Sequence, residues 1–206
     1  MTISSSSTKL KQSKNMQANK MIQEPSLYNE IKATEAACLL VQLNGGKMGY
    51  AKCIKLLYGI EREALKRWMR PVIFDDLYSL PHGQIVSKTM NLAQGLKETD
   101  ESFWSQHLRK ENNVIYQKKE AGLEKLSVAE IDLIKEIYEA NKNKTINQIF
   151  AEHHTPALYP EYRDPHGSAI KTEYPDLLNV LGKTPKQIAE FEADLKALAR
   201  LKTLLE

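Results

Sequence analysis

Apolar residues recur at helical spacing near the start of the chain. Leu27, Ile31, Thr34, Cys38 and Val41 follow one another at intervals of three or four positions. This spacing places side chains on one face of an α-helix. The pattern predicts a helix over this segment with one broad buried face.

A glycine turn separates this helix from a second one. Asn44-Gly45-Gly46 ends the first helix, because glycine accepts the left-handed conformation that closes a helix. The second helix is predicted from near Met48 to Arg70-Pro71, since proline lacks an N–H and disfavours a helical residue before it. Its predicted buried side is Cys53, Leu57, Ile60, Ala64 and Trp68. Its predicted outer side is Lys52, Lys55, Gly59, Arg62, Glu63 and Lys66.

Short apolar segments downstream predict a small β element. Val72-Ile73-Phe74 and Leu77–Leu80 flank Asp75-Asp76, which favours a hairpin or a pair of extended segments. A helix is expected over about 84–96, after Pro81-His82-Gly83. Residues 97–119 have a weak pattern typical of a variable insertion, in which residues 114–116 predict an edge strand.

Three helix-start signals follow in the second half. Ser127–Glu130 and Thr145–Gln148 are capping boxes, and Thr184-Pro185 places proline at a first helical position. The expected inward residues are Val128, Ile131, Ile134, Tyr138, Ile146, Ile149, Phe150, His153, Ile188, Phe191, Leu195 and Leu198. The predicted fold class is mainly α, a compact helical domain with a small β-hairpin or short β element. We expect a tail over 1–25, a domain over 26–182 and a C-terminal helix over 183–206 packed on it.

Composition is typical of a globular protein that stays in the cytoplasm. Of the 206 residues, 42% are hydrophobic and 27% are charged. No apolar run reaches the ~18 residues that a membrane span needs, and the first residues lack the apolar region of a secretory signal. Cys38 and Cys53 each lie in an apolar helical pattern, which favours two buried thiols over a disulfide.

The positive charge is concentrated in the predicted tail. Residues 1–23 contain four lysines and no acid, so the formal charge of +3 leaves +3 − 4 = −1 for the rest. The tail is expected to be disordered. The balanced remainder lacks the basic field of nucleic-acid binders, which argues against a nucleic-acid partner. A DNA-binding regulator that uses the tail and the Lys52–Lys66 helix face is the alternative function.

No motif of catalysis or cofactor binding is present. The sequence lacks a nucleophile elbow, a phosphate loop and a dinucleotide fingerprint, so we expect neither an enzyme nor a cofactor. Glu152, His153, His154 and His166 suggest metal ligands, and a metal enzyme is a third hypothesis. Adjacent histidines on a helix point about 100° apart, which favours a hydrogen-bonded structural role for His153 and no metal.

A basic and aromatic cluster closes the second predicted helix. Lys66, Arg67, Trp68 and Arg70 suit a solvated helix end, where basic residues interact favourably with the helix dipole. Residue by residue this is the favoured interpretation, and the alternative is an interface, because arginine and tryptophan dominate many protein contacts. Both interpretations stay open.

Several segments together resemble one known family. Lys55-Leu56-Leu57-Tyr58 with Arg62-Glu63 is similar to the "KLLYLADRE" helix of the Panacea domain, the SocA-like antitoxin domain of bacterial and phage genomes. Residues 71–86 resemble its "PI…D.Y…YGPV" segment, and 126–159 resemble its later helices. The similarity extends over about 35–181. Gln84 replaces the usual proline, and Tyr159 stands near the expected tryptophan.

The resemblance implies an antitoxin that neutralises a co-encoded toxin, commonly by direct binding. In one variation such a protein presents the toxin to a ClpXP-type protease. The residues predicted for toxin binding are Arg62, Arg67, Trp68, Arg70, Asp76, Tyr78 and His82. The positions expected to be structural are Leu56, Leu57, Tyr58, Pro71, Gly83, Val86 and His153.

Overall fold

The computed structural model describes residues 26–95 and 102–205. Its helices are α2 (Glu30–Leu43), α3 (Tyr50–Trp68), α4 (Ser87–Ala93), α5 (Phe103–His107), α6 (Val128–Asn141), α7 (Ile146–His153), α8 (Tyr174–Val180) and α9 (Pro185–Leu205). Its strands are β1 (Lys47–Gly49), β2 (Leu77–Leu80), β3 (Gly83–Val86), β4 (Leu108–Glu111), β5 (Val114–Gln117) and β6 (Ile170–Thr172). The prediction of a mainly α fold with short β elements is confirmed. The predicted tail lies outside the described residues, and the domain boundaries stay a prediction.

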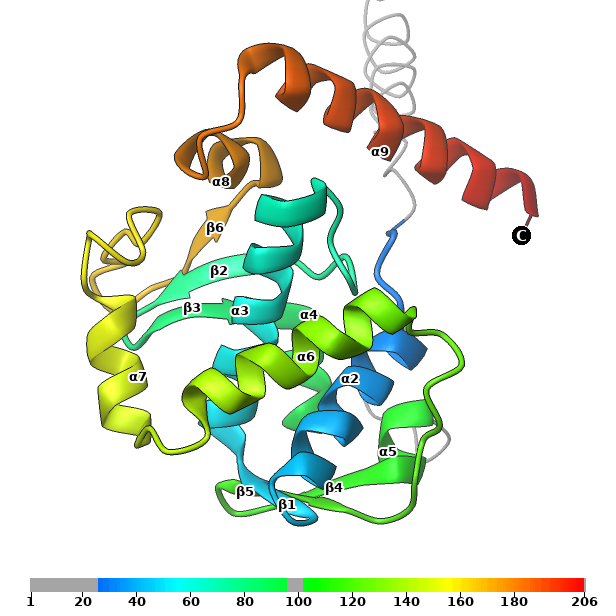
Figure 1. Cartoon of the computed structure of the whole chain (residues 1–206), viewed down its shortest axis with the longest axis vertical. Helices are drawn as coiled ribbons and strands as arrows, with labels where there is room; N and C mark the ends of the chain where they lie inside the picture. The colour runs from blue at the N-terminus through cyan, green and yellow to red at the C-terminus, as the bar shows by residue number, and fades with distance from the viewer. Residues whose placement is uncertain (1–25, 96–101, 206) are drawn as a thin grey trace, which may run out of the picture.

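Three helices form the centre of the molecule. α2, α3 and α6 pack against one another, with one small antiparallel sheet on either side of them (Figure 1). The sheet orders are β1-β5-β4 and β3-β2-β6. No helix in the described ranges is long and apolar enough to cross a membrane.

α2 confirms the first predicted helix, but it begins at Glu30, so Leu27 precedes it, and Ile31, expected on the buried face, is 36% exposed. The Asn29 side chain accepts a hydrogen bond from the Lys32 N–H at 3.0 Å, which satisfies one of the free donors at the helix start. Gly45 and Gly46 follow the helix with φ of 78° and 85°, as expected for a glycine turn. Cys38 and Cys53 are free, buried thiols, as predicted.

α3 begins later than expected, and the burial of two of its side chains differs from the prediction. Met48 belongs to β1, and the helix starts at Tyr50. Trp68 was expected in the core but is 40% exposed, because Met69 closes the helix in a left-handed conformation just beyond the packed turns. Lys55 was expected on the outer side but is buried, because the hairpin and α7 cover that part of α3.

The hairpin turns at a different place from the one predicted. β2 pairs with β3, and the turn is Pro81-His82 instead of Asp75-Asp76. Asp75 is engaged elsewhere, because its carboxylate accepts the backbone N–H groups of Lys88 and Thr89 at 2.7 and 2.9 Å. The predicted start of the helix over 84–96 was wrong, because Gly83–Val86 is a strand and α4 begins only at Ser87.

The described part of the segment expected as a variable insertion, residues 102–119, packs as part of the fold, and residues 97–101 lie outside the described residues. Residues 114–117 form the central strand β5, between β1 and β4, so the prediction of an edge strand was wrong. The sequence did not reveal that β1 is a neighbouring strand of β5. Met48 of β1 pairs with Ile115 of β5. Trp104 in α5 is fully buried.

The later helix starts follow the sequence closely. Ser127–Glu130 and Thr145–Gln148 form reciprocal capping boxes at α6 and α7, as predicted. Val128 was expected in the core but is 76% exposed in the first turn of α6. In α9, Phe191 is buried edge-on to Tyr174, whereas Leu198 is exposed, because only one side of the helix rests on the rest of the protein (Figure 1).

Candidate functional site

A buried polar cluster joins α3, the β-hairpin and α7. Lys55 Nζ donates a hydrogen bond to the Gln84 carbonyl at 2.8 Å, and His153 Nδ1 lies 2.8 Å from Gln84 Oε1. The hairpin approaches α7 at Gly83, which has a φ of +91°. A Cβ at Gly83 would lie 2.5 Å from the His153 Cβ. Only glycine therefore permits this contact.

The same cluster fastens the segment after α7 to α3. Tyr58 donates its hydroxyl hydrogen to Glu161 Oε1 at 2.9 Å, and Arg62 Nε donates to the same oxygen at 2.6 Å. Arg62 Nη2 also donates to the Leu158 carbonyl. The Tyr159 ring stacks on His153 with 4.2 Å between centroids. These contacts hold the chain that leaves α7 in a defined position.

The positions predicted to be structural are all buried in this framework. They are Leu56, Leu57, Tyr58, Pro71, Gly83, Val86 and His153. The two departures from the family pattern contribute to it as well: Gln84 contacts His153 through its side chain, and Tyr159 supplies the stacked ring. These motif side chains therefore pack inside the protein.

The cluster is rich in hydrogen-bond donors and positive charge. Burial lowers the pKa of Lys55 to about 7, and among the described residues no carboxylate forms an ion pair with it. Burial, together with the nearby charges of Lys55, His154 and Arg62, lowers the pKa of His153 to about 2. His153 is therefore neutral at physiological pH.

Buried Lys55 predicts an unusual dependence of stability on pH. Its pKa falls from about 10.5 in the unfolded chain to about 7 in the folded protein. The unfolded chain then binds more protons between these values, so stability rises with pH, by about 2 kcal/mol between pH 7 and 9. Above pH 9 the buried thiols Cys38 and Cys53 oppose this gain, because burial raises their pKa to about 12.

Urea unfolding at pH 7, 8 and 9 measures this effect. The wild type should gain stability over this range, and Lys55→Met should lose most of the gain. A parallel rise in both proteins would show that Lys55 is not its source.

A second buried network was not foreseen from the sequence. Glu61 Oε1 accepts the backbone N–H groups of Val72 and Ile73 at 2.8 and 2.7 Å, and burial raises the pKa of Glu61 to about 7. Tyr174 donates its hydroxyl hydrogen to the Asp75 carbonyl at 2.7 Å. The only sequence signal was an acid among apolar helix positions. This network positions the chain between α3 and the hairpin.

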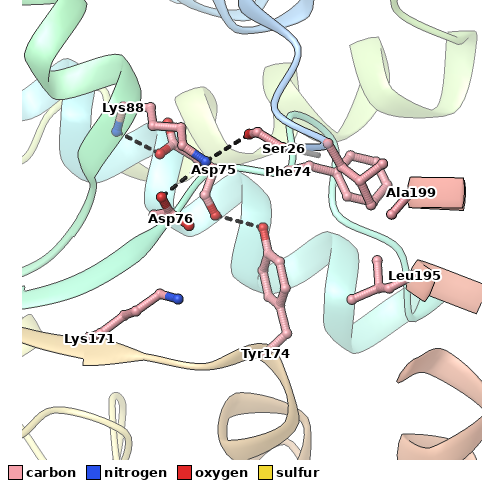
Figure 2. Close-up of a pocket in the computed structure, with 10 residues that line it drawn as sticks. Ser26, Phe74, Asp75, Asp76, Lys88, Lys171, Tyr174, Leu195 and Ala199 are labelled. Atoms are coloured by element: carbon pink, nitrogen blue, oxygen red, sulfur yellow. Dashed lines mark hydrogen bonds and ion pairs between the residues drawn. The ribbon is translucent and has the colours of Figure 1, made fainter. Parts of the chain in front are cut away.

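A groove beside α9 has a mixed lining (Figure 2). Its volume is about 490 Å³, and we call it the α9 groove. Lys88 pairs with Asp76 at 3.0 Å and donates to Ser26 Oγ at 2.9 Å. Leu195 and Ala199 of α9 supply apolar surface on the other side. Of the predicted toxin-binding residues, Asp76 lines this groove.

The end of α3 carries three of the predicted toxin-binding residues. Arg67 donates a hydrogen bond to Glu63 at 2.7 Å and forms a bidentate hydrogen-bonded ion pair with Glu136 of α6. Trp68 and Arg70 are exposed beside it. The three residues are close in the chain, at the end of α3, and all are exposed.

The other predicted toxin-binding residues lie elsewhere. Arg62 is half-buried against Glu161, and His82 stacks on Phe150 of α7 with 5.0 Å between centroids. Tyr78 is half-buried on β2, between β3 and β6. The seven residues thus occupy separate regions: the end of α3, the surroundings of α7, the hairpin and the α9 groove.

The basic helix face proposed for DNA binding is largely engaged within the protein. Lys55 is buried, and Arg62 pairs with Glu161. Lys52 Nζ donates to the carbonyls of Lys142 and Lys144, both at 2.9 Å. The face does not offer the continuous exposed positive surface that contact with phosphates needs.

The histidines considered as metal ligands are dispersed. His153 contacts Gln84, while His154 Nε2 lies 2.9 Å from the Pro81 carbonyl and His166 is exposed. Within residues 26–95 and 102–205, no three His, Cys, Asp or Glu side chains are grouped as a metal site requires. His153 is buried and makes a hydrogen bond, as expected from the sequence.

Comparison with known families agrees with the motif resemblance. Residues 54–157, half of the chain, match the family described as "Antitoxin SocA-like, Panacea domain". The chain belongs to this family. The match is shorter than the expected 35–181, and it runs from α3 through α7, which contain most of the buried polar cluster. No significant match was found among curated proteins or among solved structures.

Proposed function

We propose that this protein is an antitoxin that neutralises a cognate toxin protein by binding it directly in the cytoplasm. Membership of the SocA-like antitoxin family carries the proposal. Binding of this kind requires a rigid folded surface and no catalysis. The buried polar cluster supplies the rigidity, because it ties α3, the hairpin and α7 together through side chains.

The end of α3 is the surface that we propose for the toxin. Trp68 is 40% exposed, and Arg67 is held in place by Glu63 and Glu136. Ordered arginine and exposed tryptophan are common anchors of interfaces. A specific complex would bury about 1,600 Å² in total, so the surface must extend well beyond these side chains.

Co-expression with each neighbouring gene product tests the proposal. One neighbour should stop growth alone and be neutralised by this protein. Trp68→Ala should weaken toxin binding about 30-fold, as expected for an anchor worth about 2 kcal/mol. Val128→Ala is the matched control, because it removes an exposed apolar side chain from the start of α6. Absence of a neutralised neighbour would contradict the proposed function, and equal effects of the two variants would contradict the proposed surface.

A proteolytic adaptor role is a specific form of this proposal. In that form, a ClpXP-type protease degrades the toxin that the antitoxin presents. Neutralisation should then fail in cells without the protease, although the purified proteins still bind. Neutralisation that persists in such cells would show that binding alone is sufficient.

A further inference from the structure

A small pocket opens beside the buried polar cluster, between α3, α6 and α7. Its volume is about 90 Å³, and we call it the α3–α7 pocket. Lys55, Gly59 and Arg62 of α3 line one side, and His153 and Tyr159 line the other. The space corresponds to about three water molecules at ~30 Å³ each. It suits one side chain and is too small for a typical metabolite.

The cations of this pocket have unused donors. A lysine ammonium has three N–H groups, and Lys55 uses one of them on the Gln84 carbonyl. Its ammonium also lies 5.6 Å from the centre of the Phe150 ring, but among the described residues no other hydrogen-bond acceptor and no carboxylate contacts it. Arg62 binds Glu161 and Leu158 through Nε and Nη2, which leaves Nη1 without a partner among the same residues. Glu63 also lines the pocket, but Arg67 and Lys66 pair with it.

α3, which forms one wall of the pocket, contains Gly59, and the surroundings of Gly59 leave room for a larger side chain. A Cβ at Gly59 would meet only the Ile137 Cγ2, at 3.8 Å, which is an ordinary contact. Glycine within a helix is less stable than alanine there. Gly59 also lines the pocket. Its missing side chain keeps the space beside Lys55 open.

From the buried Lys55 ammonium that has no carboxylate partner, the guanidinium N–H groups of Arg62 Nη1 and the open wall at Gly59, we infer that the α3–α7 pocket binds a carboxylate. The source that fits its size is an aspartate or glutamate side chain of the toxin. Only this source rests on the proposed function. A carboxylate would accept the unused N–H groups of Lys55 and supply the negative charge that buried lysine lacks.

Titration of the isotopically labelled full chain tests the pocket directly. The probe is N-acetylglutamate amide, and its neutral isostere N-acetylglutamine amide is the ligand control. Amide spectra should show saturable shifts at Gly59 and its neighbours with the charged probe. Lys55→Met should weaken binding about tenfold, the loss expected for one charge-assisted hydrogen bond. Lys52→Met, on the same helix but bound to carbonyls outside the lining, should bind as the wild type does.

Gly59→Ala distinguishes a loss of the pocket from a loss of stability. It should melt no lower than the wild type and bind the charged probe several-fold more weakly, because its methyl group occupies pocket volume. Equal binding of the two probes, absence of saturable binding, or unchanged binding by Gly59→Ala would overturn the inference.

Measurements of toxin binding test whether the toxin supplies the carboxylate. Gly59→Ala should weaken toxin binding by a factor similar to its effect on the probe. Unchanged toxin affinity alongside weakened probe binding would overturn the toxin as the source. A wild type that binds the probe but neutralises no neighbouring gene product would contradict the proposed function while supporting the pocket.

Discussion

Gly83→Ala is expected to lower the free energy of unfolding by about 3 kcal/mol. Two effects add at this position. The added Cβ would lie 2.5 Å from the His153 Cβ and 3.0 Å from its Cγ, and the φ of +91° is one that alanine rarely adopts. The hairpin would have to move away from α7, which would separate Gln84 from His153. Urea unfolding followed by circular dichroism measures the loss.

Gly46→Ala is the matched control for this change. Gly46 has a similar φ of +85°, but nothing lies within 4 Å of its added Cβ. It should cost about 1 kcal/mol, the conformational part alone. Equal losses at the two glycines would show that the close approach to His153 contributes nothing.

Glu61→Ala is expected to destabilise the protein by about 4 kcal/mol. The Glu61 carboxylate is fully buried and accepts the N–H groups of Val72 and Ile73. Each buried N–H left without an acceptor costs about 1–3 kcal/mol, and the lost side chain leaves a cavity. The connection between α3 and the hairpin should therefore lose its main internal support. Urea unfolding at pH 7 measures the effect.

Glu61→Gln distinguishes the hydrogen bonds from the charge. Glutamine keeps an acceptor oxygen at the same distance along the side chain, so it should cost no more than about 1 kcal/mol. Because burial raises the pKa of Glu61 to about 7, the wild type should also lose stability as pH rises from about 4.5 to 7, and Glu61→Gln should lose less. A glutamine variant as unstable as the alanine variant would contradict this account.

The elements that the sequence predicted well are those fixed by local chemistry. Asn44-Gly45-Gly46 ends α2, and the capping boxes at Ser127 and Thr145 start α6 and α7, because each signal acts within one helical turn. The family motifs could be recognised for a similar reason, since each occupies a short continuous segment.

The errors arose where distant residues decide the outcome. Asp75 looked like a turn residue, but its carboxylate caps a helix that starts twelve positions later, at Ser87. Lys55 looked like an outer lysine until the hairpin and α7 covered it. Residues 114–117 became a central strand because β1 pairs with them from far earlier in the chain. No local pattern contains this information.

In the candidate site, too, local motifs were predictable and contacts between distant residues were not. The sequence identified the residues of the scaffold, among them Tyr58, Gly83 and His153, because they lie in recognisable motifs. It did not show that Arg62 would pair with Glu161, or that Gly59 would stand beside a pocket, since both depend on packing between helices. The predicted toxin-binding residues therefore divide among several surfaces instead of forming one.

Isothermal titration of the purified protein with its toxin, with toxin activity assayed in the same mixtures, tests the central claim. If neutralisation is direct binding, heat is released up to a fixed molar ratio, and toxin activity falls in proportion to the fraction bound. A toxin that stays fully active in the saturated complex, or one that is inactivated without forming a complex, would contradict the account.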